Sequence, residues 1–235
     1  MTTGALLVAS GGLLAAYLLG AVPFGYLAGR LRGIDVRAVG SGNIGATNVA
    51  RALGKPLGIA VFILDTAKGY AAAGPLAWLV LDLVSLPAEG LLRSVLAPLY
   101  ALAVCAGHNW TVFLNFRGGR GVATAAGVLL ALAPIPAVAG LACWAILAAV
   151  FRYVSLASML AAVVTAGLCV GLAAWNEKLA ETWPTWSLTA VLAALIIVRH
   201  RANIGRLLKG QEPKIGRKSA EPARAAQPEG ESRGS

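Results

Sequence analysis

Long runs of Ala, Leu, Val and Gly dominate the chain, and short polar segments interrupt them. Apolar runs approaching 20 residues are typical of helices that cross a bilayer. The runs lack the strict alternation of apolar and polar positions that a membrane β-barrel needs. We therefore predict an all-α, polytopic integral membrane protein with about seven transmembrane helices, at 5–29, 57–80, 94–106, 121–133, 136–151, 154–174 and 187–199. A six-span arrangement is the alternative if 121–151 forms one broken hairpin.

Composition agrees with a membrane location. Only 13% of the residues are charged and 58% are hydrophobic, whereas a soluble domain carries about 25% charged residues. Cys105, Cys143 and Cys169 lie in apolar segments without paired spacing, which indicates buried side chains rather than disulfides or metal ligands. We predict a single transmembrane domain over 1–216. The tail at 217–235 is rich in Pro, Ala, Glu, Arg and Ser, and is predicted to be disordered and cytoplasmic.

The distribution of cations predicts the orientation, because Lys and Arg are retained on the cytoplasmic side. With seven spans, 17 of the 20 Lys and Arg residues fall on one side, and only Arg93 and Lys178 fall on the other. This asymmetry predicts an outside N-terminus and a cytoplasmic C-terminus. The net charge of +10 does not indicate nucleic-acid binding, because the cations are spread over short loops without a recognisable binding module. Attraction to anionic lipid explains them better.

Three polar clusters at the ends of apolar segments carry the candidate chemistry, and all three fall on the predicted cytoplasmic side. In the first, at 40–48, glycines including Gly42 free the backbone to turn its N–H groups inward. Side-chain donors come from Ser41, Asn43, Thr47 and Asn48, and the planar guanidinium of Arg51 follows. This chemistry suits phosphate. The alternative is a glycine-rich turn that caps the next helix.

The second cluster precedes the fourth predicted span. Gly118, Gly119 and Gly121 lie at the start of this helix, where free N–H groups and the helix dipole favour an anion. Arg120 adds a permanent charge there, whereas Arg117 is the better candidate for a positive-inside anchor. Upstream, His108 is either a hydrogen-bonded structural residue or a chemical one.

The third region consists of two separate segments, one at 152–158 and one at 200–212. Ser155 and Ser158 are three residues apart and share a helix face, although serines in membrane helices often bond to the preceding turn. His200 and Asn203 likewise share a face at the end of the last span. Glu212 could orient a cation or cap backbone groups.

Two charges fall within the second span. Asp65 and Lys68 are spaced i, i+3. Isolated charges are costly inside a membrane. They could pair with each other, which is a structural role that we favour for Lys68. Asp65 could instead hold an arginine of the site.

Together these motifs resemble the bacterial membrane acyl-phosphate:glycerol-3-phosphate acyltransferases, the PlsY family. The matching segments are 40–48 with Arg51, 64–69, 107–109, 118–124, 152–158, 200–207 and 210–212. The resemblance implies seven spans, an external N-terminus and an active site on the cytoplasmic face of the bacterial inner membrane. It also implies transfer of a fatty acyl group from acyl phosphate to the first hydroxyl of glycerol 3-phosphate, giving lysophosphatidic acid and phosphate. Membrane lipid is the expected surrounding partner, and no cofactor, metal or nucleic acid is expected.

Chemistry and resemblance together suggest the roles in the site. Acyl phosphate is already activated, so the enzyme must mainly hold two anions, align the hydroxyl and stabilise the oxyanion. The residues predicted to be catalytic are Ser41, Arg51, Arg120, Ser158, His200 and Asn203. Those predicted to bind substrate are Gly42, Asn43, Thr47, Asn48, His108, Gly118, Gly119, Gly121, Ser155 and Glu212. The general base could be His200, His108 or the substrate's own phosphate.

The chain departs from the family pattern at two positions. The family usually has lysine where this chain has Arg120; charge is retained, but an arginine stays protonated and cannot transfer a proton as lysine does. The usual proline after Gly-His-Asn-Trp is replaced by Thr111.

A transporter or channel for phosphate or an organophosphate is the competing class, because arginines and glycine-broken helices also bind anions in transporters. The gathering of polar clusters on one side, and the lack of a visible inverted repeat, argue against it.

Overall fold

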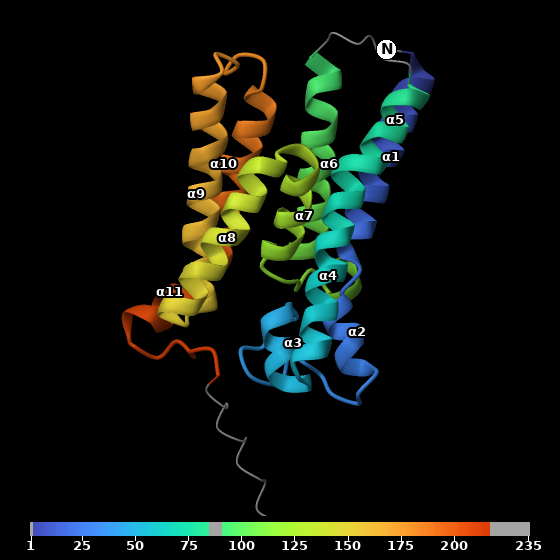
Figure 1. Ribbon diagram of the computed structural model, residues 1–235. Coiled ribbons are helices and arrows are strands. Elements are labelled where there is room, and N and C mark those ends of the chain that lie inside the picture. Colours follow the sequence, from blue (N-terminus) through green and yellow to red (C-terminus); the bar gives the residue numbers. More distant parts are fainter. Residues whose placement is uncertain (1, 85–90, 217–235) are drawn as a thin grey trace, which may run out of the picture.

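The computed structural model describes residues 2–84 and 91–216, and its regular elements within these ranges are all helices. This confirms the all-α prediction. The long helices run side by side (Figure 1), with α1 to α7 forming one half of the molecule and α8 to α11 the other. The predicted tail at 217–235 lies outside the described residues.

The first half begins with a helix that is broken by a proline. Pro23 separates α1 (Thr3–Ala21) from α2 (Phe24–Arg30), and α3 (Ala46–Leu53) is a short helix beside α2. The next long helix contains α4 (Lys55–Ala71), a π-helical turn (Ala72–Leu76) and α5 (Ala77–Leu83). Pro75 lies in this widened turn, which accommodates its missing N–H and its ring.

The remaining helices follow a down-and-up path (Figure 1). They are α6 (Leu91–Asn109), a 3₁₀ turn (Val112–Leu114), α7 (Val122–Leu132), α8 (Pro134–Phe151), α9 (Val154–Trp175), α10 (Trp183–Arg199) and α11 (Arg201–Leu208). In Figure 1, α1 begins at the upper end, whereas α11 and residues 209–216 lie at the lower end.

The described helices only partly match the seven predicted spans. Five are long and apolar enough to cross a membrane, and a sixth is obtained if α10 and α11, bent by 57°, count as one broken span. The predicted span at 121–133 corresponds to α7, whose 11 residues extend about 16 Å, roughly half of a bilayer core. Pro134 begins α8 directly after α7, so 121–151 forms two helices. The count of seven stays a prediction.

Small residues bring α7 close to α4. Gly127 of α7 faces the backbone at Thr66, and Gly69 of α4 faces the backbone at Thr124, so a Cβ at either glycine would overlap a main-chain oxygen. Small residues that allow such close approach are typical of helix packing in membranes. This contact places the start of α7, and the loop before it, beside the polar residues of α4.

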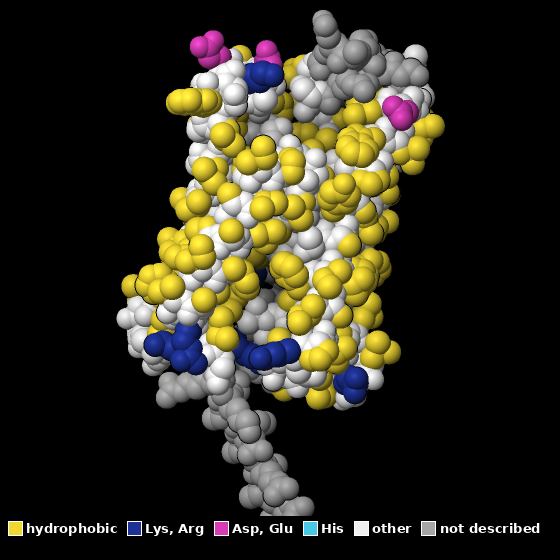
Figure 2. All heavy atoms as spheres, in the orientation of Figure 1, with side chains coloured by type: hydrophobic (Ala, Val, Ile, Leu, Met, Phe, Trp, Pro, Cys, Tyr) yellow, Lys and Arg dark blue, Asp and Glu magenta, His cyan; other side chains and the backbone are white. Residues whose placement is uncertain are grey.

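The surface is that of a membrane protein. Hydrophobic side chains cover the middle of the face in Figure 2, while Lys and Arg gather at the end that carries α2, α3 and α11. Acidic side chains appear at the opposite end. With the apolar helices, this pattern identifies a multi-pass membrane protein.

Candidate active site

A cavity of about 160 Å³ lies between the two halves of the molecule, and a hollow is visible there in Figure 2. All six residues predicted to be catalytic line it: Ser41, Arg51, Arg120, Ser158, His200 and Asn203. Seven predicted substrate-binding residues also line it: Asn43, Thr47, Asn48, His108, Gly121, Ser155 and Glu212. Gly42, Gly118 and Gly119 are not among the lining residues. Segments more than 150 residues apart in sequence therefore meet in one cavity.

The first loop is shaped by Asn48. The buried Asn48 amide donates to the carbonyls of Val36 (2.8 Å) and Val39 (3.1 Å), and its oxygen accepts from the Ser41 N–H (2.9 Å). Gly40 beside this oxygen has a φ of +58°, and a Cβ there would overlap it. Because both ends of the amide are engaged, Asn48 holds the loop that carries Ser41.

The start of α3 faces the cavity. Gly45, Ala46 and Thr47 line it, and Gly45 caps the helix without a side-chain hydrogen bond. Arg51, one turn further on, is half-buried and also lines the cavity. One of its N–H groups donates to the Pro213 carbonyl at 3.3 Å. The loop and this helix start therefore offer main-chain donors and a guanidinium on one side of the cavity.

The second loop differs from its sequence-based interpretation. The N–H groups of Gly118 and Gly119 donate to the carbonyls of Asn109 (3.2 Å) and His108 (3.0 Å), so they are not free for an anion. A Cβ on Gly118 would overlap the backbone of His108 and Asn109, and a Cβ on Gly119 would overlap the His108 ring, so these glycines allow close packing. The free amides lie one step later, because Gly121 caps α7 without a side-chain bond and lines the cavity with Val122 and Ala123.

Arg120 and Arg117 have the different environments that the sequence indicated. Arg120 lines the cavity, whereas Arg117 is exposed outside it. Burial lowers the pKa of Arg120 to about 10; the Glu212 carboxylate acts to raise this pKa, whereas the neighbouring cations Arg206, Arg199 and Arg51 lower it further. Arg120 therefore stays charged at neutral pH, in an electropositive environment suited to an anion.

Glu212 connects the segment after α11 to two helices. One carboxylate oxygen accepts from Ser155 Oγ (2.7 Å) and Asn203 Nδ2 (2.6 Å), and the other accepts from Arg206 Nε (2.8 Å). Burial would raise the pKa of Glu212, but these hydrogen bonds outweigh burial and hold the pKa below its ordinary value. An ionised carboxylate therefore orients Ser155, Asn203 and Arg206.

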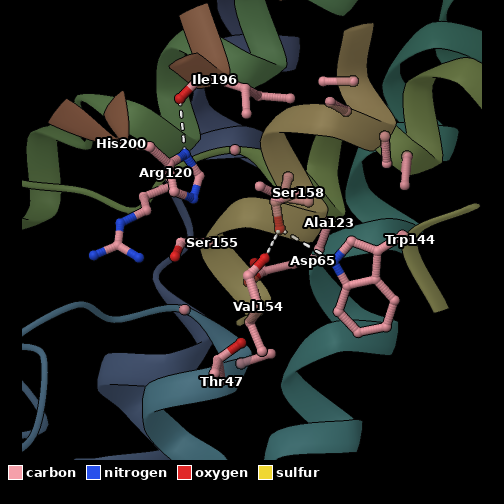
Figure 3. Close-up of a pocket in the computed structure, with 18 of the residues that line it drawn as sticks. Thr47, Asp65, Arg120, Ala123, Trp144, Val154, Ser155, Ser158, Ile196 and His200 are labelled. Carbon is pink, nitrogen blue, oxygen red and sulfur yellow. Dashed lines mark hydrogen bonds between the residues drawn. The ribbon is translucent and has the colours of Figure 1, made fainter. Parts of the chain in front are cut away.

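His200 and Ser158 both line the cavity, and each is held by its own hydrogen bonds (Figure 3). His200 Nδ1 is 2.8 Å from the Ile196 carbonyl and must donate to it, so the neutral ring has a lone pair on Nε2. Ser158 Oγ donates to the Val154 carbonyl (2.8 Å) and accepts from the Trp144 indole (3.1 Å). With its proton engaged and no base bonded to it, Ser158 is not arranged as a nucleophile.

The two charges of α4 pair with each other. Lys68 Nζ lies 2.8 Å from Asp65 Oδ1, and it donates to the Val22 carbonyl at 3.0 Å, where α1 gives way to α2. His108 Nδ1 is 3.5 Å from the same Asp65 oxygen. All three side chains are buried. The structural pairing favoured for Lys68 is therefore present, and Asp65 pairs with Lys68 rather than with an arginine of the site.

The apolar half of the cavity was not assigned from sequence. Apolar and small side chains of α7, α8, α9 and α10 line it, including Leu129, Leu141, Ala161 and Ile196. Trp144 lies at its junction with the polar half, where the indole bonds to Ser158 (Figure 3). Hydropathy marks these residues as membrane-embedded, but gives no signal that separates cavity-facing from lipid-facing positions.

Fold and site together define a class: multi-pass membrane proteins with a cavity that joins a cationic, amide-rich half to an apolar half. Within that class the chain belongs to the glycerol-3-phosphate acyltransferase family, because residues 11–210 match the family model of that description.

Relatives and solved structures agree. The chain is 46% identical to the glycerol-3-phosphate acyltransferase of Rhodospirillum rubrum over 208 residues, covering 87% of this chain and 90% of the relative. The enzyme of the same name from a Jannaschia species is 46% identical over 218 residues, with 92% and 97% covered. A crystal structure of PlsY, an integral membrane glycerol 3-phosphate acyltransferase, in its glycerol 3-phosphate form, superposes with a TM-score of 0.76 at 38% identity, covering 88% of this chain and 96% of that one. The lysophosphatidic acid form gives 0.73 at the same identity, with 88% and 95% covered.

Proposed function

We propose that this protein transfers a fatty acyl group from acyl phosphate to the sn-1 hydroxyl of glycerol 3-phosphate, releasing lysophosphatidic acid and inorganic phosphate. The observation that carries the proposal is the continuity of one cavity from Arg51 and Arg120 to the apolar lining of α7 to α10. An acyl phosphate has the same division, with an anionic head and a long apolar chain. Family membership and the glycerol 3-phosphate form of the related PlsY structure support the acceptor.

Two phosphate groups need separate sources of positive potential. The uncapped starts of α3 and α7 supply main-chain N–H groups, and Arg51 and Arg120 supply fixed charges beside them. Helix starts and guanidinium groups are both effective phosphate ligands. The same donors stabilise charge that develops on the acyl carbonyl oxygen and on the departing phosphate.

The reaction we propose needs no acyl-enzyme. The acceptor hydroxyl forms a bond to the acyl carbonyl carbon, the bond from this carbon to the phosphate oxygen breaks, and phosphate leaves with the bonding electrons. The hydroxyl proton passes to a base, for which His200 Nε2, His108 and a substrate phosphate are the candidates. The hydrogen bond from His200 Nδ1 to Ile196 supports Nε2 as an acceptor.

We further propose seven membrane crossings with the N-terminus outside and the cavity at the cytoplasmic face of the bacterial inner membrane. The opposite positions of the start of α1 and the end of α11 support an odd number of crossings (Figure 1). The gathering of Lys and Arg at the end with α3 and α11 supports the orientation (Figure 2).

The decisive experiment compares acyl donors. Purified protein is incubated with glycerol 3-phosphate and palmitoyl phosphate, palmitoyl-CoA or palmitoyl-acyl carrier protein in parallel. We expect lysophosphatidic acid and phosphate to form in equal amounts from palmitoyl phosphate only. Activity with a thioester alone would contradict the proposed donor. Uptake of labelled glycerol 3-phosphate by proteoliposomes, without acyl transfer, would support a transporter instead.

A further inference from the structure

The second glycine-rich loop, at 118–121, is held from two sides. On one side its Gly118 and Gly119 N–H groups donate to the end of α6. On the other side its carbonyls accept from Arg199, the last residue of α10. Arg199 Nη2 lies 2.7 Å from the Gly119 oxygen and 3.2 Å from the Gly118 oxygen, and Nε lies 3.1 Å from the Gly119 oxygen.

These contacts need an arginine. Its planar guanidinium presents several N–H donors in a fixed fork, whereas a lysine ammonium is a single point on a flexible stem. Two successive carbonyl oxygens are therefore bridged by one rigid group. The guanidinium also lies over the Trp110 ring, 5.7 Å from its centroid, which fixes its orientation further.

Arg199 connects two parts of the site without lining the cavity. It directly precedes His200, and its acceptor Gly119 directly precedes Arg120, and both of these neighbours line the cavity. Figure 3 shows Arg120 beside His200. A shift of the loop away from α10 would separate these two side chains.

We propose that Arg199 is a positioning residue for the acyl transfer, which holds Arg120 in place for the substrate anion by clamping the loop to the end of α10. The inference rests on the proposed function for its activity readout. Arg199 then affects the reaction through the position of Arg120, and not through direct contact with the substrate.

A double-mutant cycle tests this route, because residues that act through each other give non-additive effects. The four proteins are wild type, Arg199→Lys, Arg120→Ala and the double variant. Arg199→Lys keeps the charge and loses the fork, so we expect kcat/KM for glycerol 3-phosphate to fall at least about 10-fold. In the Arg120→Ala background the same change should cost less than about 2-fold. Equal losses in both backgrounds would overturn the proposal.

Arg201 supplies the matched control. It lies two residues further along and is exposed, so Arg201→Lys should change kcat/KM by less than about 2-fold. An equal loss from Arg201→Lys and Arg199→Lys would show that an arginine-to-lysine change anywhere at this end of α10 lowers the activity, and would overturn the clamp. If Arg199→Lys does not fold, Arg199→Gln takes its place in the cycle, because the glutamine amide keeps an N–H that can donate to the Gly119 carbonyl.

A binding readout separates this inference from the proposed function. Inorganic phosphate should stabilise the detergent-purified wild type against heat, and Arg199→Lys should raise the half-maximal phosphate concentration about 10-fold. If no acyl phosphate is consumed but this shift occurs, the proposed donor fails and the positioning role stands. If wild type is active but phosphate affinity and kcat/KM are unchanged in Arg199→Lys, the positioning role fails alone.

Discussion

Arg120 and Gly40 illustrate two ways in which one residue serves the cavity. Arg120 supplies a charge that no other residue of its loop brings to the cavity, since Arg117 is exposed outside it. Gly40 supplies a backbone conformation, because its positive φ and its contact with Asn48 leave no room for a side chain. Thr111, where the family usually has proline, has a third role: its hydroxyl donates to the Ala21 carbonyl at 2.6 Å and accepts from the Phe113 N–H at 3.2 Å.

Replacement of Arg120 should separate charge from geometry. Arg120→Lys should retain much of the activity because the positive charge survives, whereas Arg120→Ala should lower kcat/KM by about 100-fold. Steady-state phosphate release with both substrates measures the effect, with Arg117→Ala as the control. An Arg120→Ala variant as active as wild type would show that this side chain is only a topological anchor.

Replacement of Gly40 should destabilise the first loop. Gly40→Ala combines an unfavourable positive φ with overlap on the Asn48 oxygen, and should cost about 3 kcal/mol of unfolding free energy. Gly33→Ala is the matched control, because Gly33 also has a positive φ (+70°) but open space around it; it should cost about 1 kcal/mol. Thermal unfolding in detergent compares them. Equal costs would mean that the overlap with Asn48 is relieved without consequence.

At the scale of elements, the segment at 210–216 contacts residues of several helices. Glu212 binds Ser155 of α9 and Asn203 and Arg206 of α11, while the Ile215 N–H donates to the Arg152 carbonyl after α8 at 2.8 Å. The Arg152 guanidinium donates in turn to the Ile215 carbonyl at 2.8 Å. Arg51 of α3 reaches the Pro213 carbonyl. The segment therefore bridges both halves at the mouth of the cavity.

This bridge should be sensitive to acid. The pKa of Glu212 is below its ordinary value in the folded state, so its stabilising contribution is present above the ordinary pKa and is lost as pH falls through the folded-state pKa. Glu212→Gln should cost about 3 kcal/mol at neutral pH. The difference from wild type in melting temperature should shrink from pH 7 towards pH 4 and below. The exposed Glu181 provides the control, Glu181→Gln; a pH-independent difference for Glu212→Gln would contradict the role of its charge.

For the whole molecule, the proposed orientation places α3, α11 and the mouth of the cavity on the cytoplasmic side. Lys178 follows α9 and Lys209 follows α11, and both are exposed. These positions lie at opposite ends of α10–α11 and report on opposite sides of the bilayer.

Single cysteines at these positions test the orientation. In a variant without Cys105, Cys143 and Cys169, we expect a membrane-impermeant maleimide to label Lys178→Cys in intact spheroplasts. Lys209→Cys should react only after the membrane is permeabilised. The reverse pattern would invert the topology, and equal labelling of both positions in intact spheroplasts would contradict a membrane crossing between residues 178 and 209.

Helices and the set of candidate site residues could be predicted from the sequence because their signals are local. Apolar runs gave helices near the observed ones, although Pro23, Pro75 and Pro134 changed where they bend or end. The donors Ser41, Arg51 and Arg120 were recognisable because glycines, hydroxyls and guanidinium groups gather in short polar segments at the ends of apolar runs. The bounds of α7 (Val122–Leu132) lie close to the predicted span at 121–133, because Pro134 begins the next helix.

By itself, the sequence determined that this is an all-helical membrane protein with polar clusters suited to phosphate, and which side chains those clusters contain. Only the tertiary structure decided how the donors are used. Gly118 and Gly119 give their N–H groups to the end of α6 and their carbonyls to Arg199, about 80 residues away, so the N–H groups that remain without a side-chain cap are those at the start of α7. The physical reason is that hydropathy and residue type act within a few turns, whereas each of these hydrogen bonds depends on how distant helices pack.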